Sequence, residues 1–353
     1  MNAEIDHAAR RPRAFASDRS AQAARGALKA AWWGVTGVAA RTLAGTARAR
    51  PAGFSPKESP PPEGFVRRSW LEAFEKDARD VAAGLYPPME DAPIRLKGAA
   101  DVVADARRVE DRRRRGDATE ARADAGDAPA YPVYYRQNFH FQSGGWFTPE
   151  SARRYESQVE VLFGGAAGAM RRRALSVLAE AWRLDDHRGK RIVDIACGSG
   201  AFLGDLRRAF PRAHLFGLDL SRPYLAEAAS RSGVRSLVQA NVERLPFGDG
   251  TLDAVTCVYL FHELPPRHRR AVAREIARVL RPGGLLAFAD SIQPVDEPRL
   301  AWLLEAFPAY FHEPYYADYC RTDLDELFAA AGLSARGRDN AFLTKAILFE
   351  RSR

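Results

Sequence analysis

The segment RIVDIACGSGAFL, residues 191–203, sets a carboxylate into an apolar run that ends in a glycine-rich turn. Ile192, Val193 and Ile195 have the composition of a buried strand, and the residues after Gly200 continue as a helix. Gly198 and Gly200 allow a tight turn and a close approach of a ligand to the backbone. The helix that follows directs its amide groups toward that ligand. Dinucleotide enzymes use a similar turn, so the segment predicts a nucleotide-type site without naming the nucleotide.

Short apolar runs alternate with helical stretches after this point. They occupy residues 191–196, 213–218, 234–239, 253–259 and 284–290. Such alternation predicts crossover connections and a parallel sheet. We therefore expect an α/β, Rossmann-like, doubly wound fold with a mostly parallel sheet, helices on both faces, a helical N-terminal region and a small lid. One helix is expected from Ser151 toward Trp182, and another from Pro265 to Leu280.

Two further polar residues follow strands of this series. Asp219 ends the second strand, nineteen residues beyond Gly200. A carboxylate there can accept hydrogen bonds from both hydroxyls of an adenosine ribose, while Ser221 is the better candidate for capping the next helix. Asn241 follows the third strand, where its amide could bind an adenine edge. In a doubly wound sheet these strand ends meet at one edge, where ligands bind.

The ordered set VDIACGSG, GLDLS, NVERLPF, LDAVTCVYLFHEL and VLRPGGLLAFAD resembles the class I S-adenosylmethionine-dependent methyltransferases. Within that family it is similar to the branch of ubiquinone/menaquinone-type C-methyltransferases and small-molecule methyltransferases. The resemblance is strong over about residues 188–292, looser from 131 to the C-terminus, and absent from 1–130. It implies that S-adenosylmethionine is the cofactor and that the acid on the first strand lies near its methionine end. The cofactor residues that it implies are Asp194, Ala196, Gly198, Gly200, Asp219, Leu220, Asn241, Val242 and Tyr259.

The sequence departs from the family pattern at two of these positions. Ala196 stands where the family has its first loop glycine, and Asn241 stands where an aspartate is usual. Asn241 keeps an acceptor oxygen and adds donors, so adenine binding is expected to survive.

Catalysis and substrate binding are assigned to segments around the core. His262, after the fourth strand, is the candidate general base, with a structural role in capping the next helix as the alternative. Glu263 is expected to face solvent. Two aromatic segments could line a pocket for a planar or lipophilic small molecule, or pack as a lid. Their candidate substrate residues are His140, Trp146, His312, Tyr315 and Tyr316.

The N-terminal part of the chain divides by composition. Residues 1–50 are Ala-rich and carry eight Arg and one Lys against three acids, which fits a disordered tail or a segment on a membrane surface. Residues 51–130 comprise a Pro-rich linker, an amphipathic helix and a charged segment expected to fray into a disordered loop. In that segment the run Arg112 to Arg115 is expected to be solvated. Residues 131–353 form the methyltransferase domain, with its core at 188–292.

Composition narrows the setting and the partners. The chain has 353 residues and a net charge of +8. Its three cysteines have no paired or metal-type spacing, so we expect no metal site and a reducing environment. The expected location is cytoplasmic or peripheral at the membrane. The longest apolar run, residues 30–40, is shorter than the ~20 residues of a membrane span. A small-molecule substrate is expected, and nucleic acid is not. The alternatives are an RNA or protein methyltransferase using the basic surface and a non-catalytic cofactor-binding protein. The oligomeric state stays open.

Overall fold

The computed structural model describes residues 54–89, 105, 108–125 and 131–353. Within these ranges seven strands form one sheet in the order β3-β2-β1-β4-β5-β7-β6. The strands β3, β2, β1, β4 and β5 pair in parallel, and β7 pairs antiparallel with both β5 and β6. The strands are β1 (Arg191–Ile195), β2 (His214–Asp219), β3 (Ser236–Gln239), β4 (Leu252–Val258), β5 (Leu280–Ser291), β6 (Leu333–Ala341) and β7 (Thr344–Arg351).

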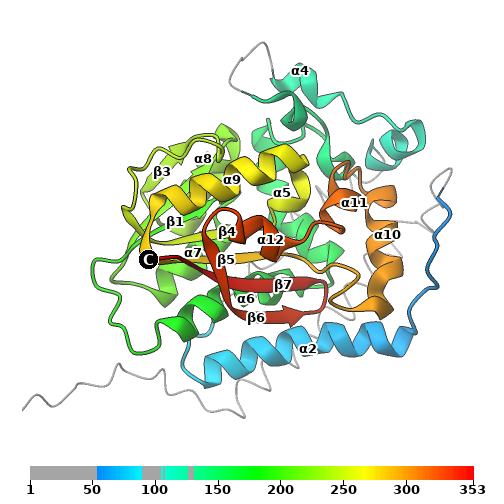
Figure 1. Ribbon diagram of the computed structural model, residues 1–353. Coiled ribbons are helices and arrows are strands. Elements are labelled where there is room, and N and C mark those ends of the chain that lie inside the picture. The colour runs from blue at the N-terminus through cyan, green and yellow to red at the C-terminus, as the bar shows by residue number, and fades with distance from the viewer. Residues whose placement is uncertain (1–53, 90–104, 106–107, 126–130) are drawn as a thin grey trace, which may run out of the picture.

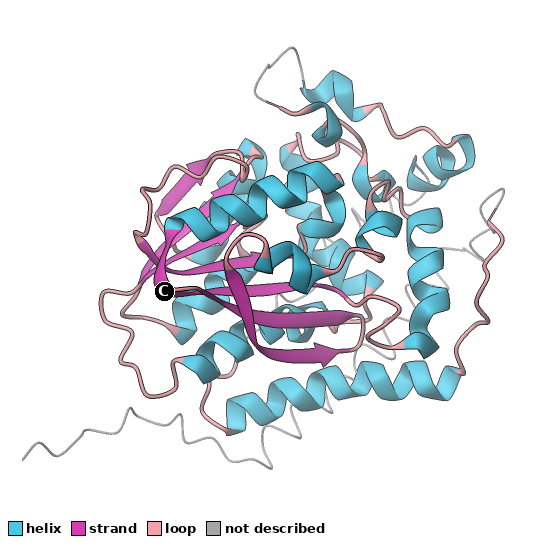
Figure 2. Ribbon diagram, viewed as in Figure 1, coloured by secondary structure: helices cyan, strands magenta, loops and turns pink. Residues whose placement is uncertain are grey.

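Helices cover both faces of this sheet (Figures 1 and 2). They are α2 (Glu63–Ala82), α4 (Ala121–Ala125), α5 (Pro149–Leu162), α6 (Ala167–Ala181), α7 (Ala201–Ala209), α8 (Arg222–Ser232), α9 (Pro266–Val279), α10 (Ala301–Tyr310), α11 (Tyr316–Tyr319) and α12 (Leu324–Ala329). Short 3-10 turns are η1 (Val133–Tyr135), η2 (Phe139–Phe141), η3 (Phe261–Glu263) and η4 (Pro298–Leu300). The expected doubly wound, mostly parallel α/β fold is confirmed.

Alternation along the strands divides the core between the two faces. Val193 and Ile195 of β1 pack into one cluster with α9 and α12, while Ile192 packs into the other with α6 and α7. Because successive side chains of a strand point to opposite faces, a strand buried on both sides is apolar throughout. Asp194 is therefore the polar exception in β1, and its neighbours fix the direction in which it points.

The long helix expected from Ser151 to Trp182 is wrong in one respect, because two helices occupy that range. α5 ends at Leu162 and α6 begins at Ala167. Gly164 and Gly165 between them have φ of 59° and 83°, left-handed values that end an α-helix at low cost for glycine. A Cβ on Gly164 would lie 3.3 Å from Nε1 of Trp70 on α2, so the break also lets α2 approach.

The predicted amphipathic helix of the N-terminal region is α2, which packs along α6 and β6 at the lower edge of Figure 1. Two consecutive arginines of α6 hold it. Arg172 is 1% exposed and donates from Nε and Nη2 to the two carboxylate oxygens of Asp77, at 2.6 and 2.7 Å. Arg173, also 1% exposed, pairs with Asp80 on α2 and Asp339 on β6. Such pairing offsets the cost of burying the two charges.

The charged segment departs from its expectation. Residues 108–115 are helical and residues 121–125 form α4, so part of the expected disordered loop is ordered. Arg112, expected in a solvated run, is buried and donates to Glu120, to the Phe141 carbonyl and to Ser143. Two of its partners, Phe141 and Ser143, lie about thirty residues further along the chain, so the composition around Arg112 does not indicate that it is buried. Residues 1–50 lie outside the described residues.

Candidate active site

The glycine turn after β1 takes the shape that its sequence predicts. Ala196, Gly198 and Gly200 have φ of 53°, 53° and 78°, and α7 begins at the next residue, Ala201. A Cβ on Gly200 would lie 2.8 Å from the Cα of Ala228 on α8, so only glycine fits there. Gly198 has nothing within 4 Å of such a Cβ, so the space beside it is open. Ala196 holds a left-handed conformation that glycine would adopt with less strain.

Asp219, the last residue of β2, organises this turn. Its Oδ2 accepts from the backbone N–H of Gly198 and its Oδ1 from that of Ser221, both at 2.8 Å. Burial raises the pKa of the carboxyl to about 6, although the backbone donors favour the charged form. Ser221 Oγ accepts from the Tyr224 N–H at the start of α8, as its predicted capping role requires.

Asp194 lies beside Asp219 at the carboxyl ends of the parallel strands. It is 2% exposed, and Oγ1 of Thr256 on β4 donates to its Oδ1 at 2.6 Å. Burial raises the pKa of Asp194 to about 7, the Thr256 hydrogen bond opposes that rise, and the charge of Asp219 adds to it. A buried carboxyl with one donor retains unused acceptor capacity, which a ligand in the neighbouring cavity can meet.

A cavity opens at this edge of the sheet and joins the residues predicted for the cofactor. Asn241 reaches it from the turn after β3, with its Oδ1 accepting from the Glu243 N–H at 2.9 Å. Gly200 lies behind the turn and does not line the cavity. The predicted cofactor residues that do line it are Asp194, Ala196, Gly198, Asp219, Leu220, Asn241, Val242 and Tyr259.

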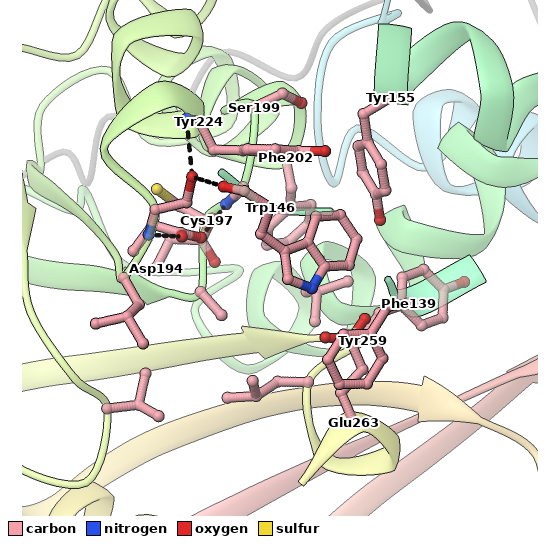
Figure 3. A pocket seen from close by; sticks show the side chains of 18 of the residues that line it. Phe139, Trp146, Tyr155, Asp194, Cys197, Ser199, Phe202, Tyr224, Tyr259 and Glu263 are labelled. Atoms are coloured by element: carbon pink, nitrogen blue, oxygen red, sulfur yellow. Dashed lines mark hydrogen bonds between the residues drawn. The ribbon is translucent and has the colours of Figure 1, made fainter. Parts of the chain in front are cut away.

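Aromatic side chains from outside the sheet form the opposite wall. In Figure 3, Trp146 and Tyr155 lie on the side of the cavity opposite Asp194, with Phe139 beside them. The Trp146 carbonyl accepts from Ser221 Oγ at 2.5 Å, and its indole Nε1–H has no hydrogen-bond partner among the described residues. The remaining aromatic lining residues are Tyr134, Tyr135, Phe202, Tyr224 and Tyr259.

Only Trp146 of the five candidate substrate residues lines the cavity. His312 contacts Gln137, with 2.7 Å between Nε2 and Oε1, and Tyr316 is 3% exposed with its hydroxyl 2.5 Å from Ser291 Oγ. Tyr315 packs behind Phe139 and Trp146. His140 lies between two glutamates, Glu263 and Glu313. These four form a second layer, and a direct contact of theirs with substrate stays a prediction.

His262, the candidate base, lies beside the cavity without lining it. Its Nδ1 is 2.6 Å from Oδ1 of Asp290 at the end of β5, and its side chain is 8% exposed. Burial lowers the pKa of His262, but the Asp290 carboxylate outweighs it and raises the value to about 9. The imidazole is therefore protonated at neutral pH. Its predicted role as a base stays a prediction.

The sequence reasoning misplaced Glu263 and missed two other charged residues of the cavity. Glu263 does not face solvent: it lines the cavity, with a side chain 16% exposed, and burial raises its pKa to about 7. Glu156 of α5 accepts from Ser199 Oγ at 2.5 Å and pairs with Arg171 of α6 at 2.9 Å. Both line the cavity. The helix break at Gly164 folds α5 against α6 and so brings Glu156 close to Arg171. The glycine pair at 164 and 165 was the sequence signal that could have predicted this break.

The chain is similar in sequence to known methyltransferases. The methyltransferase domain family matches residues 192–284. An uncharacterised methyltransferase of Synechocystis sp. is 31% identical over 150 residues, which are 41% of this chain and 68% of that protein. A demethylmenaquinone methyltransferase of Thermus thermophilus is 34% identical over 149 residues, which are 41% of this chain and 64% of that protein, less than two thirds of its length. A solved S-adenosylmethionine-dependent methyltransferase of Aquifex aeolicus is similar over 58% of this chain and 98% of that chain, with 16% identity and a TM-score of 0.41.

The matched residues cover strands β1 to β4 and the turns after them, which carry the glycine turn, Asp194, Asp219 and Asn241. The Synechocystis relative extends the likeness over more than two thirds of its own length. The chain therefore belongs to the class I S-adenosylmethionine-dependent methyltransferases.

Proposed function

We propose that this chain transfers a methyl group from S-adenosylmethionine to an oxygen or carbon of a small aromatic or lipophilic molecule. One observation carries the proposal: the cofactor residues and an aromatic wall line the same cavity. Aromatic side chains with polar tips suit a planar or lipophilic substrate. The Thermus thermophilus relative is named a demethylmenaquinone methyltransferase, and such a substrate belongs to that class.

The polar groups of the cavity fit the cofactor. Asp219 offers carboxylate oxygens to the two ribose hydroxyls, and Asn241 with Val242 would flank the adenine. Glu156 and Arg171 offer one charge of each sign, which suits the amino and carboxylate groups of the methionine portion. Both oxygens of Glu156 have partners, Ser199 Oγ and the Arg171 guanidinium. Nε of Arg171 is buried without a hydrogen-bond partner in the described ranges, so it retains a donor for a ligand.

The chemistry asks little of the protein beyond position. The bound cofactor supplies an activated methyl group on a cationic sulfur. The chain holds the acceptor in line with that methyl group and keeps water out, and such positioning can contribute up to ~7–11 kcal/mol to lowering a barrier. Trp146, Tyr155 and Phe139 form the part of the wall that would exclude water. An acceptor that carries a proton also needs a base.

His262 is the base that the sequence predicts. Its pairing with Asp290 is the arrangement in which a carboxylate orients an imidazole and stabilises its charged form. Because its pKa is about 9, His262 would act as a base only in the minor, neutral form at pH 7. If it is the base, the rate will keep rising with pH up to about 9.

A first test uses purified protein, labelled S-adenosylmethionine and a fractionated cell extract. We expect label in the lipid or small-molecule fraction. Label only in RNA or protein would instead support methylation of a macromolecule by the basic surface. Cofactor binding without any label transfer would favour a non-catalytic binding protein.

Asp219→Ala is the matching variant for cofactor binding. Charge-assisted hydrogen bonds contribute about 1.5–3 kcal/mol each, so the loss of two should weaken S-adenosylmethionine binding by at least ~100-fold. Isothermal titration calorimetry measures the change. Asp249→Ala is the control, because its side chain is 80% exposed and lies outside the cavity, and it should bind as the wild type does. Equal affinity of the Asp219→Ala variant and the wild type would contradict the assignment.

A further inference from the structure

An acidic side chain reaches the cavity where β4 ends. Glu263 closes the 3-10 turn η3, four residues after Tyr259, and lines the cavity together with Leu260 and Leu264. Figure 3 shows it next to Tyr259, on the side of the cavity away from Asp194. Apolar and aromatic residues surround it, so its carboxyl is a polar group in an otherwise apolar part of the wall.

Two buried groups stand behind this carboxyl. His140 Nε2 lies 4.0 Å from Glu263 Oε1, and His140 Nδ1 lies 3.2 Å from Glu313 Oε1. Glu313 is 2% exposed, and neither of its carboxyl oxygens makes a hydrogen bond among the described residues. His140 itself has a left-handed backbone with φ of 56°, a conformation uncommon for any residue but glycine. The fold thus holds a Glu-His-Glu row that leads away from the cavity.

Within the Glu263–His140–Glu313 row, Glu263 is the group whose pKa lies near neutral pH. Burial lowers the pKa of His140 to about 3, as do the charges of His262 and His312, and burial raises that of Glu313 well above its usual value. His140 is therefore neutral at pH 7, and burial favours the neutral form of Glu313. Burial raises the pKa of Glu263 to about 7, the His262 charge opposes the rise, and Asp290 and Asp219 add to it.

The groups that face Glu263 come from every element packed around it. They are His140 of η2, His262 of η3, Asp219 of β2, Asp290 of β5, Glu313 of the segment before α11, Tyr134 and Tyr135 of η1, and Tyr155 of α5. The three tyrosines have pKa values raised by burial and stay protonated. Among the described residues no group of three or more His, Cys, Asp or Glu has the arrangement of a metal site.

We propose that Glu263 accepts the proton that a substrate hydroxyl loses when it is methylated, with the positive charge of His262 favouring the carboxylate form. This inference rests on the proposed function and names both its base and its substrate class. The acceptor is a neutral, acidic hydroxyl such as that of a phenol or an enol. A substrate carboxylate needs no base and would be repelled by the charge of Glu263.

The step balances without another reactant. The hydroxyl proton passes to the Glu263 carboxylate, and the freed electron pair on oxygen forms the bond to the methyl carbon. The bond between that carbon and sulfur breaks, and its electron pair stays on sulfur, which becomes neutral. Glu263 leaves the step as a neutral acid, and it returns the proton to solvent before the next turnover.

The first test measures protons rather than turnover. S-adenosylmethionine carries a positive charge that S-adenosylhomocysteine lacks, so its binding should ionise a nearby carboxyl. At pH 7 a group with a pKa of about 7 is half protonated, and the wild type should release up to about half a proton more with the methionine compound than with the homocysteine compound. Titration calorimetry in buffers of different ionisation enthalpy measures this difference.

Two variants assign the proton to its residue. Glu263→Gln should remove the part of the difference that comes from Glu263 and leave the part contributed by Asp194, whose pKa is also about 7. Glu227→Gln on α8, whose carboxylate pairs with Arg231 outside the cavity, is the matched control and should keep it. An unchanged difference in the Glu263→Gln variant overturns the inference. If the wild type binds neither ligand, the proposed function fails instead.

The second test follows methyl transfer to a panel of phenols and hydroquinones of graded lipophilicity. General-base catalysis is worth about 10²–10⁴-fold, so Glu263→Gln should lose at least 100-fold in kcat and the rise of the rate through pH 7. Glu263→Asp should recover part of the rate. The inference is overturned if Glu263→Gln keeps the wild-type pH profile, or if His262→Gln alone removes it. Circular dichroism of each variant separates these effects from misfolding.

Discussion

Asp194 shows what a carboxylate in a buried strand costs and why it is there. Its single side-chain donor, Thr256, does not offset the loss of water, and the pKa of the carboxyl rises to about 7. In the folded protein without cofactor the side chain therefore holds its proton above the pH at which an unfolded aspartate loses it. The raised pKa is a cost to the unliganded protein, and we propose that contact with the cofactor offsets it, a frequent compromise at functional sites.

Asp194→Asn should reveal this compromise. Because the folded pKa is raised, the folded state binds more protons than the unfolded state between about pH 4 and 7, and stability falls as the pH rises through that window. The variant lacks this loss, so without cofactor it should be more stable than the wild type by about 1–3 kcal/mol at pH 8 and equal to it at pH 4.

Urea unfolding at the two pH values measures the effect, and titration with S-adenosylmethionine should show weaker binding by the variant. A wild type as stable as the variant at pH 8 would show that Asp194 carries no such cost. Asp219 and Glu263, whose pKa values are also raised, keep part of the pH dependence in the variant.

Residues next to the glycine turn could be predicted from the sequence because their roles are local. Asp219 ends its strand, and Ser221 caps the next helix as expected. Glu263 could not be placed, since the groups that bury it come from residue 140, residue 313 and β5. His262 was placed beside the cavity, but its partner Asp290 is 28 residues away in the chain. Local pattern names the residue types, and only packing decides which of them face the ligand.

At the scale of elements the parallel strands were predictable and the antiparallel edge was not. Each parallel strand is a short apolar run between helices, with bounds within two residues of those expected except for β5, which begins at Leu280. β6 and β7 were missed. β6 reads LSARGRDNA and is half exposed along its length, because it lies at the edge of the sheet with one pairing partner. An edge strand with polar residues carries no apolar signal.

The attachment of α2 to α6 gives a prediction of its own. Arg172→Leu removes a charged partner of Asp77 and the 3.5 Å contact with Asp205, two acids whose side chains are only 18% and 13% exposed. The Tyr86 hydroxyl, 3.0 Å from Asp77, remains as a neutral donor. Breaking a buried pair from one side costs about 3–5 kcal/mol, so the variant should unfold at correspondingly lower urea concentration and lose α2 early to limited proteolysis.

Arg188→Leu is the control for this substitution. Arg188 is 75% exposed and its change should stay within about 0.5 kcal/mol of the wild type. If both variants lose a similar amount of unfolding free energy, the buried pair contributes no more to stability than an exposed charge does.

At the scale of the whole molecule, part of the N-terminal region belongs to the folded core. α2 supplies Phe74 and Val81 to buried clusters shared with α6, so a truncation before Tyr131 would strip the core. No helix of the described ranges is long and apolar enough to cross a membrane. The basic segment 1–50 lies outside those ranges, and its predicted surface contact with anionic lipid stays a prediction.

Removing residues 1–53 tests that contact cleanly. The shortened protein should keep its thermal midpoint and its cofactor affinity, because no described core residue is lost. If the basic segment binds anionic lipid, cosedimentation with vesicles that contain phosphatidylserine should fall, and added salt should weaken what the full chain shows. Equal sedimentation of both proteins would leave the segment without a role at the membrane.

The cavity joins two parts of the chain that differ in origin. Its floor comes from the strands and turns within residues 192–284, which the methyltransferase domain family matches. Its roof comes from residues 134–171, which lie outside the matched range. Ser221 links the two, because one hydroxyl caps α8 beside Asp219 and donates to the Trp146 carbonyl. Substitutions in the roof can therefore reshape the cavity without changing Asp194 or Asp219, and the Ser221 hydroxyl is a contact through which such a change would reach the glycine turn.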